Sequence, residues 1–513
     1  MKLKTIYSAC YLIIASTMLA MVTGCEKDLN LRPSKGSGVV ITQTSDLDAL
    51  LNNYTSFCNE INRTAIYSTD DFQLDTGIYN ALPSRYPIDG IEFGTWDTQY
   101  IPTDFSEQFW SGEYSKIYQA NLVLSYVNKV TGPDKQKADL AADAYFIRAY
   151  SYWELVNNYC LPYSQANLNE PGLPIKLLPN YEESLVRQSL GATYKQIQND
   201  LNEALKTTVP LVQNGVNRSW RANITAVNAF AARFYLSIGD YAAALKYANA
   251  SLSSYSTLVD YNSGMRYGTP ASVTVTNKNG TKQTVTIQYP YTHDRTDVSY
   301  QLTWPESTYF RVLNFGNSLN WFIPSQALLN LYDKTNDLRY KYNIVQNFSY
   351  VRGLINPAYG YPGYIFYGET AIPLGPTTAE MYLIKAECLA RTNDVPGAMA
   401  AVNVLHRART VTGSPDLIAT TQAAAITSIL EERRREMPFR QRWSDVKRLN
   451  NNDYAGDNVA PFTRLFYQYN SSSTIKPLVF QTFTLPVNSR RFAVPIPQND
   501  INNSNGQITQ NTY

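Results

Sequence analysis

The sequence has few of the residues on which catalytic and metal sites most often depend. It contains 2 histidines, His293 and His406, and 5 cysteines among 513 residues. The histidines lie in different predicted elements, and the chain has no zinc-protease, paired-cysteine, phosphate-loop or nucleophile-elbow motif. Acidic pairs such as Asp70-Asp71 could serve glycoside hydrolysis, but among 42 acidic residues such pairs arise by chance. The sequence therefore predicts a protein that is not an enzyme, with no catalytic residue, metal site or cofactor.

The chain also lacks an excess of charge of either sign. It has 44 Lys and Arg against 42 Asp and Glu, and Lys2 and Lys4 belong to an N-terminal segment that we expect to be removed. A mature chain without net charge has no global attraction to nucleic acids or to anionic lipids. We therefore expect no nucleic-acid partner.

Cysteine pairing is not predicted either. Cys10 and Cys25 belong to the N-terminal segment, which leaves Cys58, Cys160 and Cys388 in the rest of the chain. An odd number of cysteines with no metal-ligand or disulfide spacing favours buried free thiols.

The N-terminal segment reads as a targeting signal. Its apolar run from Ile6 to Ala20 is short for a membrane span and ends at Val22-Thr23-Gly24-Cys25, which resembles a bacterial lipobox. We predict a lipoprotein signal peptide over residues 1–24, lipidation of Cys25 and a polar tether over residues 25–45. An uncleaved anchor helix and ordinary secretion remain alternatives. More than one acyl chain, at about 0.8 kcal/mol per buried CH2, would hold the protein on a membrane.

The richest pattern in the chain is a helical repeat. Residues 379–391 and 395–409 have apolar residues at three- and four-residue steps and predict two antiparallel helices. Residues 223–254 carry the same pattern at a constant offset, with Ala232 matching Ala386 and Gly239 matching Asn393. Small residues where two helices approach, and Gly or Asn at the turn, are typical of tetratricopeptide units. We predict a mainly α fold, a tetratricopeptide-like scaffold of about four helix pairs, two of them degenerate pairs at 46–130 and 137–205.

Long insertions separate these helix pairs. Helices are predicted over residues 104–130, 137–159, 194–205 and 421–449, with Ser45 as the cap of an earlier helix. A small β-hairpin is predicted over residues 272–289, with its turn at Asn279-Gly280. Residues 68–103, 160–190, 291–322 and 349–376 show no helical period and predict irregular loops.

Some charged residues interrupt predicted apolar faces. Arg148 and Glu387 need partners if they are buried, and pairing between helices is the favoured interpretation. The run from Glu431 to Glu436 alternates acids and arginines at helical spacing, which predicts mutual pairing along one helix. We interpret Asp70-Asp71 as a loop cap or a solvated turn.

Aromatic residues in the irregular segments are the candidate binding groups. A sugar ring has an apolar face that stacks on an indole or phenol ring, while its hydroxyls need polar side chains nearby. The alternative for each aromatic residue is that it pins its loop to the scaffold. The predicted ligand-binding residues are Tyr79, Trp96, Asp97, Tyr100, Trp304 and Tyr309.

Several segments resemble the motifs of one family, the SusD/RagB-like outer-membrane lipoproteins of Bacteroidota. These segments are Phe146-Ile147-Arg148-Ala149-Tyr150, Glu380 to Glu387, Glu432 to Phe439, Arg442 to Arg448, Pro495-Ile496-Pro497 and Gln510-Asn511. Glu26-Lys27-Asp28 also resembles the charged export signal of Bacteroidota lipoproteins. The chain departs from the family pattern after Phe439, where the usual glycine is missing, and at Thr512, which replaces the usual Pro-Gly.

The resemblance implies four tetratricopeptide units that support an irregular ligand-binding face, with a stacking aromatic near Trp96. It implies an outer-membrane lipoprotein that faces the cell exterior, captures oligosaccharide and has a TonB-dependent, SusC-like transporter as its partner. It also suggests regions at 46–255, 256–376 and 377–513. Peptide or another nutrient as ligand remains an alternative, as does a purely structural tetratricopeptide adaptor, which the long aromatic insertions disfavour.

Overall fold

The computed structural model describes residues 40–81, 83, 86, 88–97, 108–180, 182–265, 271–276, 279–287, 302–314, 322–345, 362–367, 371–471 and 474–513. The predicted signal peptide, Cys25 and most of the tether lie outside the described residues, as do Tyr100 and His293. None of the helices in these ranges is long and apolar enough to cross a membrane.

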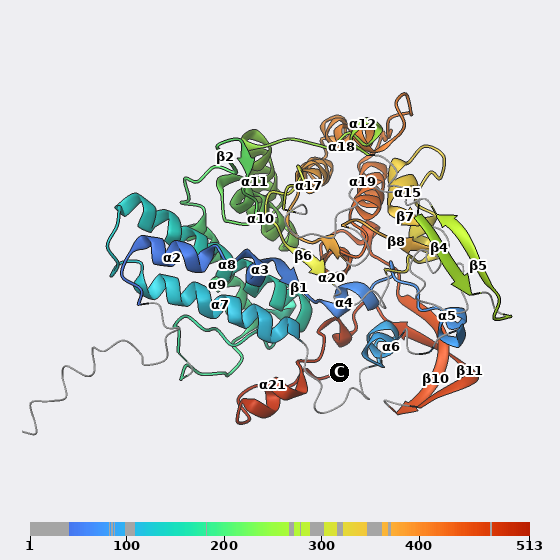
Figure 1. Cartoon of the computed structure of the whole chain (residues 1–513), viewed down its shortest axis with the longest axis horizontal. Coiled ribbons are helices and arrows are strands. Elements are labelled where there is room, and N and C mark those ends of the chain that lie inside the picture. The colour runs from blue at the N-terminus through green and yellow to red at the C-terminus, as the bar shows by residue number, and fades with distance from the viewer. Residues whose placement is uncertain are drawn as a thin grey trace, which may run out of the picture.

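Long helices pack side by side along one half of the molecule (Figure 1). In chain order they are α2 (Thr44–Leu51), α7 (Gln108–Tyr126), α8 (Asp134–Tyr159), α9 (Leu190–Ala204), α10 (Ile224–Ser237), α11 (Tyr241–Ser254), α17 (Thr378–Arg391), α18 (Val395–Arg409) and α19 (Gln422–Glu436). Helix α7 packs on α8, α8 on α9, α10 on α11, α11 on α17, and α17 on both α18 and α19. This succession confirms the mainly α, helical-repeat fold that the sequence predicts.

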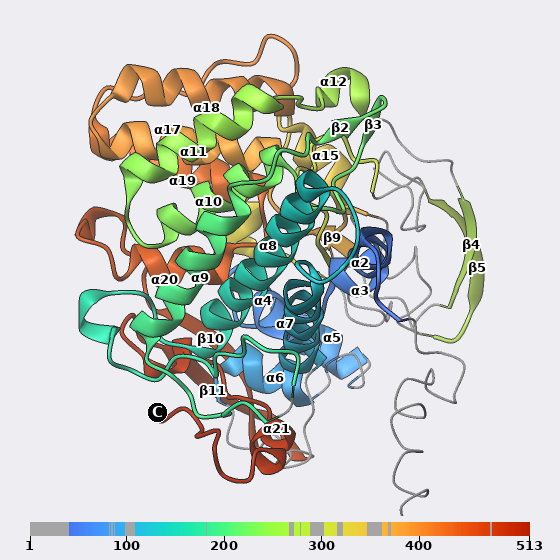
Figure 2. The ribbon, with the colours of Figure 1, turned by 90° about the vertical axis from the view of Figure 1, so that its left-hand side faces the viewer.

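The two best-matched repeats are neighbours in space although a long insertion separates them in the chain. Helix α11 of the first pair packs directly on α17 of the second (Figure 2). The turns of the two pairs share one conformation, since Gly239 has a φ of +81° and Asn393 a φ of +66°. Gly and Asn are the residues that adopt this left-handed backbone at the least cost. The repeat is therefore interrupted in sequence and continuous in the structure.

Several helix boundaries differ from the sequence prediction by a few residues, and two differences are larger in consequence. The cap of α2 is Gln43, and Ser45 lies inside the helix. The predicted helix over residues 421–449 is two helices, α19 and α20 (Arg442–Leu449). They are separated at Pro438, which cannot continue a helix, and at Phe439, which has a φ of +65°.

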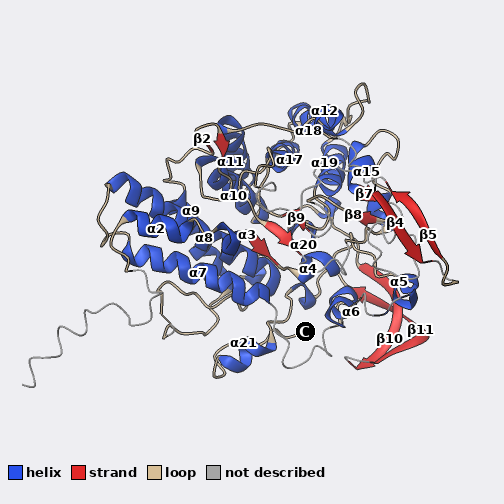
Figure 3. Cartoon of the chain, in the orientation of Figure 1, coloured by secondary structure: helices blue, strands red, loops and turns tan. Residues whose placement is uncertain are grey.

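The two longer hairpins and the short helices α5, α6 and α15 lie on the other half of the molecule, whereas β2, α3 and α12 lie beside the long helices (Figure 3). The short helices are α3 (Tyr54–Cys58), α4 (Arg63–Tyr67), α5 (Thr76–Ala81), α6 (Ile88–Thr95), α12 (Tyr261–Gly264), α14 (Gln326–Leu329), α15 (Leu338–Asn343) and α21 (Gln498–Asn503). A three-stranded sheet has the order β1 (Asn59–Glu60), β6 (Val312–Asn314) and β9 (Ala371–Pro373), with β1 parallel and β9 antiparallel to β6. Smaller antiparallel pairs are β2 (Val212–Gln213) with β3 (Val216–Asn217), and β7 (Ile344–Val345) with β8 (Gly363–Tyr364).

Two longer hairpins complete the fold. The pair β4 (Ala271–Thr276) and β5 (Lys282–Ile287) confirms the predicted hairpin, and Gly280 in its turn has a φ of +82°. It stands at the edge of the molecule in Figure 2. The other hairpin, β10 (Phe462–Ser471) with β11 (Thr474–Leu485), was not predicted. Its apolar residues do not alternate along the sequence, since Leu465, Phe466 and Tyr467 are consecutive, and only the structure shows that Leu465 is exposed while Phe462 and Phe466 are buried.

Buried ion pairs join the helices, as predicted for two residues. Arg148 of α8 pairs with Asp200 of α9 at 2.6 Å, and Glu387 of α17 pairs with Arg448 of α20 at 2.6 Å. Cys58, Cys160 and Cys388 are buried, also as predicted.

One further charge prediction holds in part and another is wrong. Within the run on α19, Arg435 pairs with Glu432 at 2.7 Å and with Glu431 at 3.9 Å, as predicted. Arg433, Arg434 and Glu436 instead pair with other elements, as Arg433 does with Asp445 at 2.8 Å. This happens because α19 is covered by neighbouring elements on several sides, so its charges are buried among their side chains. Asp70 and Asp71 are likewise not a solvated turn, since Arg442 and Arg434 bind them at 2.7 Å each.

Candidate functional site

Tyr79 and Asp97 border the β10–β11 hairpin. The Tyr79 ring packs edge-on against Phe466 at 5.6 Å and against Tyr467 at 5.8 Å, measured between ring centroids, and remains half-buried. Burial raises the pKa of Tyr79. The Asp97 backbone carbonyl accepts a hydrogen bond from the hydroxyl of Tyr469 at 3.1 Å. Both predicted residues thus flank one strand, β10.

The Asp97 carboxylate lies near a cation that the sequence reading did not single out. Nη1 of Arg491 is 3.7 Å from a carboxylate oxygen of Asp97, and both side chains are partly exposed. Arg491 also donates a hydrogen bond to the backbone carbonyl of Trp96. A partly exposed carboxylate can accept hydrogen bonds from the hydroxyls of a polar ligand, and the guanidinium beside it can donate hydrogen bonds to them.

Trp96 directly follows helix α6 and is packed inside the protein. It has a φ of +56°, its side chain is 4% exposed, and its indole N–H donates to the carbonyl of Ser68 at 2.8 Å. The ring packs on Phe462 at 5.9 Å, and the Arg464 guanidinium lies 4.9 Å from the ring centroid. With these neighbours the indole has no open face on which a sugar ring could stack, and it pins its loop to the hairpin.

Arg464 fastens the hairpin to the segments that carry the candidate residues. Its guanidinium donates hydrogen bonds to the backbone carbonyls of Tyr67, Thr69, Phe72 and Gly94. Burial lowers the pKa of Arg464 to about 10. Because one side chain binds carbonyls on both sides of α5, it positions Tyr79 and Asp97 relative to each other.

Ion pairs with helices α19 and α20 hold the same region from the other side. Arg442 binds Asp70 through two hydrogen bonds of 2.7 and 2.8 Å, and Asp71 accepts from Arg434 at 2.7 Å and from the Phe439 amide at 3.0 Å. Burial would raise the pKa of Asp70, but the Arg442 and Arg434 charges outweigh it and hold that pKa at about 2. The turn before α5 is therefore anchored to α19 and α20.

Trp304 and Tyr309 pack against other elements. Trp304 is 3% exposed and contacts Phe366 edge-on at 5.3 Å. Tyr309 is 2% exposed and packs on Phe146 at 4.7 Å and on Tyr150 at 5.4 Å, both on helix α8. These two rings are core contacts, which is the alternative that the sequence left open for each aromatic residue. Ligand contact by Tyr79, Asp97 and Tyr100 stays a prediction.

Metal-binding groups do not gather in the described part of the chain. No group of three or more His, Cys, Asp or Glu side chains within it could hold a metal ion. His406 lies instead beside a buried carboxylate, with its Nδ1 3.4 Å from Glu432.

Two family models match this chain at its two ends. A model described as starch-binding associating with outer membrane matches residues 29–236, and a model described as SusD family matches residues 378–513. The chain belongs to the SusD family. The first matched stretch ends within α10, and the second begins at the start of α17. The two matches therefore lie on either side of the long insertion between the two helix pairs.

Solved structures of the SusD family share this fold. A putative sugar-binding protein from Bacteroides vulgatus superposes with a TM-score of 0.64 at 18% identity, covering 92% of this chain and 99% of that one. A SusD superfamily protein from Bacteroides thetaiotaomicron gives a TM-score of 0.60 at 17% identity, covering 92% and 100%. A laminarin-binding SusD-like protein gives 0.55 at 17% identity, covering 92% and 99%. No curated protein matches the chain.

Proposed function

We propose that this SusD-family protein is a surface-exposed outer-membrane lipoprotein that binds oligosaccharides and delivers them to a TonB-dependent transporter. The observation that carries the proposal is the match of both family models, one of which is described by starch binding and by association with the outer membrane. A structural neighbour that binds laminarin supports a glycan as the ligand. The lipobox-like Val22-Thr23-Gly24-Cys25 supports anchoring through a lipid on Cys25.

The binding surface that we propose lies beside the β10–β11 hairpin. Tyr79 contributes a half-buried ring, and Asp97 contributes a partly exposed carboxylate beside Arg491. Tyr100 follows Asp97 closely in the chain, and we include it as a further aromatic residue of the proposed binding surface. A ring for stacking and charged groups for hydroxyls are the two chemistries that a sugar requires.

A binding assay with a panel of glycans tests this site. The non-lipidated Cys25→Ser protein is titrated calorimetrically with starch, laminarin and other glucans, mannans and xylans. Tyr79→Ala and Asp97→Asn should each weaken binding of the recognised glycan about tenfold, since each removes one stacking or charged contact. Tyr382→Ala is a matched control, because Tyr382 is also half-buried but lies on α17 in the helical-repeat half. Undiminished binding in both site variants would contradict the assignment.

The uptake role needs a separate test. The lipidated protein should co-purify from outer membranes with a transporter barrel after mild detergent extraction, and surface proteolysis of intact cells should cleave it. Binding of peptides, with no response to any glycan of the panel, would instead favour the peptide-uptake alternative. Absence from the outer membrane would contradict the lipoprotein role.

A further inference from the structure

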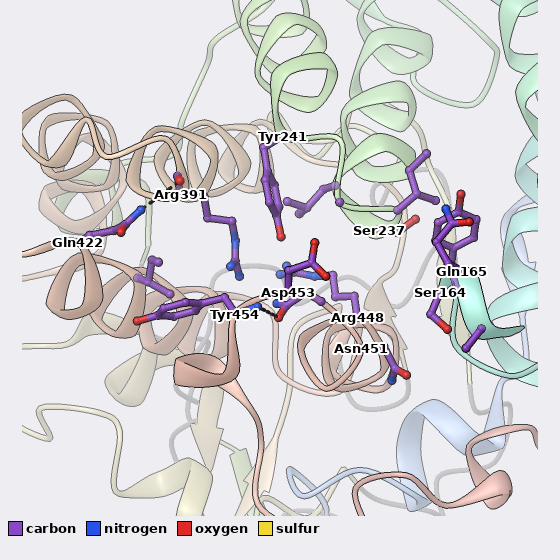
Figure 4. Close-up of a pocket in the computed structure, with 17 residues that line it drawn as sticks. Ser164, Gln165, Ser237, Tyr241, Arg391, Gln422, Arg448, Asn451, Asp453 and Tyr454 are labelled. Atoms are coloured by element: carbon purple, nitrogen blue, oxygen red, sulfur yellow. Dashed lines mark hydrogen bonds between the residues drawn. The ribbon is translucent and has the colours of Figure 1, made fainter.

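A cavity of about 530 Å³ lies among the repeat helices. Five separate segments line it: residues 163–166 after α8, the turn between α10 and α11, the end of α17, the facing start of α19, and residues 448–454 at the end of α20 (Figure 4). None of the described residues that line it belongs to α5, α6 or the β10–β11 hairpin. It is therefore distinct from the binding surface proposed above, and its size is within the range of small-molecule sites.

A buried ion cluster forms one wall of the cavity. Glu387, which is fully buried, accepts hydrogen bonds from Arg448 at 2.6 and 2.9 Å and from Arg391 at 2.8 Å. Arg391 also binds Asp457 at 2.6 Å, and Arg448 binds Asp445 at 2.9 Å. Burial would raise the pKa of Glu387, but the two guanidinium charges hold it at about 2. Asp445 also binds Arg433 at 2.8 Å. Three arginines thus face three carboxylates, which leaves no spare positive charge for an anion.

Polar groups without a protein partner project into this space. Among the described residues, nothing accepts from Nη1 of Arg391, and nothing pairs with the Tyr241 hydroxyl or with the Asp453 carboxylate. In Figure 4 the Tyr241 phenol extends from α11 toward Arg391 and Asp453. The Arg391 guanidinium lies 5.0 Å from the Tyr241 ring centroid, which orders that ring. The cavity thus presents one donor, one acceptor and one group that can act as both.

Amide side chains add further acceptors. The Gln422 amide nitrogen donates to the carbonyls of Ala390 and Arg391, and the Asn451 amide nitrogen donates to the carbonyl of Lys447. Both side-chain nitrogens are therefore fixed, and their carbonyl oxygens remain able to accept hydrogen bonds from a ligand.

Comparison with the matching repeat shows that helix packing at the position of Tyr241 does not require a tyrosine side chain. Tyr241 follows the capping residue Asp240, as Val395 follows the capping residue Asp394 in the second repeat. The apolar Val395 packs against a hydrophobic cluster at that place. Tyr241 therefore adds a hydroxyl group where the repeat itself needs only an apolar side chain.

We propose that this cavity is a second ligand site that binds a neutral pyranose sugar. Each sugar hydroxyl both donates and accepts, which matches the mixture of Tyr241, Arg391, Asp453 and the two amide oxygens. The Tyr241 ring offers an aromatic surface beside these polar groups. The wall has no spare positive charge, and the Asp453 carboxylate disfavours phosphate and carboxylate ligands by like-charge repulsion. This site is independent of the oligosaccharide site proposed beside the hairpin.

Saturation-transfer NMR with free monosaccharides tests the second site. The Cys25→Ser protein carrying Tyr79→Ala, which weakens the first site, is mixed with D-glucose, D-galactose, D-mannose or D-xylose at millimolar concentration. Saturation should pass to the ring protons of at least one sugar. Adding Tyr241→Phe should weaken the binding affinity for that sugar about fivefold, which is the effect of losing one neutral hydrogen bond. Adding Asp453→Asn should weaken the affinity about tenfold.

The control variant is Tyr247→Phe, which removes a hydroxyl from the same helix at a half-buried residue outside the cavity lining. It should leave saturation transfer unchanged. No transfer to any of the four sugars, or transfer undiminished in both Tyr241→Phe and Asp453→Asn, would overturn the proposal. So would tighter binding of inorganic phosphate, followed by phosphorus NMR. Glycan-panel titration of Tyr241→Phe alone reports on the first site, so failure of one site is distinguishable from failure of the other.

Discussion

The helical-repeat half and the half built around the β10–β11 hairpin are stabilised in different ways. In the repeats, small apolar residues such as Ala232 and Ala386 are fully buried where helices meet. Asp240 and Asp394 cap the helices that begin directly after them, each by accepting a hydrogen bond from the backbone amide three residues later. Around the hairpin, Arg464 binds carbonyls of segments almost 400 positions earlier in the chain. Helix pairs that are close in the chain thus form most of the first half, whereas side chains that reach hundreds of positions along the chain fasten the second.

This difference explains why the hairpin half can carry ligand-binding variation. Irregular segments held by a few polar anchors tolerate substitution between the anchors, while a repeat packed through alanines does not. The same difference predicts which substitutions damage each half and by how much.

The largest expected loss of stability follows removal of the Arg464 anchor. Arg464→Ala leaves the carbonyls of Tyr67, Thr69, Phe72 and Gly94 without this donor, and should lower the free energy of unfolding by about 4 kcal/mol. Urea denaturation followed by circular dichroism measures the loss. Arg407→Ala is the control, because Arg407 is exposed and its ion pair within the described part of the chain is with partly exposed Asp416, and it should leave the midpoint unchanged. Equal midpoints for wild type and Arg464→Ala would remove the distinction between the halves.

Acid should destabilise the repeat half through Glu387. Its folded-state pKa of about 2 lies below the ordinary value of 4.5, so its contribution to stability is complete above pH 4.5. As the pH falls from 4.5 toward 2, the contribution is lost, and the difference amounts to about 3 kcal/mol. Thermal unfolding measured across this range should show a steep acid limb, and Glu387→Gln should flatten it. An equally steep limb in the variant would show that other carboxyls dominate.

Loss of a buried ion pair should destabilise different segments in the two halves. Asp71→Asn and Asp200→Asn each weaken a buried arginine pair and should each cost about 2 kcal/mol. Hydrogen–deuterium exchange should rise at residues 68–72 and 439 in Asp71→Asn, and at α8 and α9 in Asp200→Asn. Only Asp71→Asn should also weaken glycan binding. Exchange that rises throughout the chain in both variants would mean that the halves unfold as one unit.

The smallest effects are expected at the repeat turns. Gly239→Ala places a Cβ on a backbone with a φ of +81° and should cost about 1 kcal/mol, although no atom lies within 4 Å of that Cβ. Asn393→Gly at the matching turn should cost almost nothing, because glycine accepts the φ of +66° without strain. Urea midpoints measure both. A larger loss for Asn393→Gly than for Gly239→Ala would contradict the equivalence of the two turns.

The repeat half was predictable because its signal is local. The spacing of Ala386 and Ala232, and the turn residues Asn393 and Gly239, are sufficient to identify helix pairs. The partners of Arg464 and Asp71 were not predictable, because nothing in the neighbouring sequence indicates contacts hundreds of positions away. For the same reason the burial of Trp96, Trp304 and Tyr309 could not be foreseen, since a loop aromatic that stacks on a sugar and one that pins its loop have the same sequence signature.

The central claim is that the repeat half is a scaffold and that the surface beside the hairpin binds the glycan. Hydrogen–deuterium exchange of the Cys25→Ser protein, with and without the tightest-binding glycan of the panel, tests it most directly. Ligand binding should slow exchange at residues 76–97 and 462–471. Slower exchange confined to α7, α8 and α9, with no change at the hairpin, would contradict it.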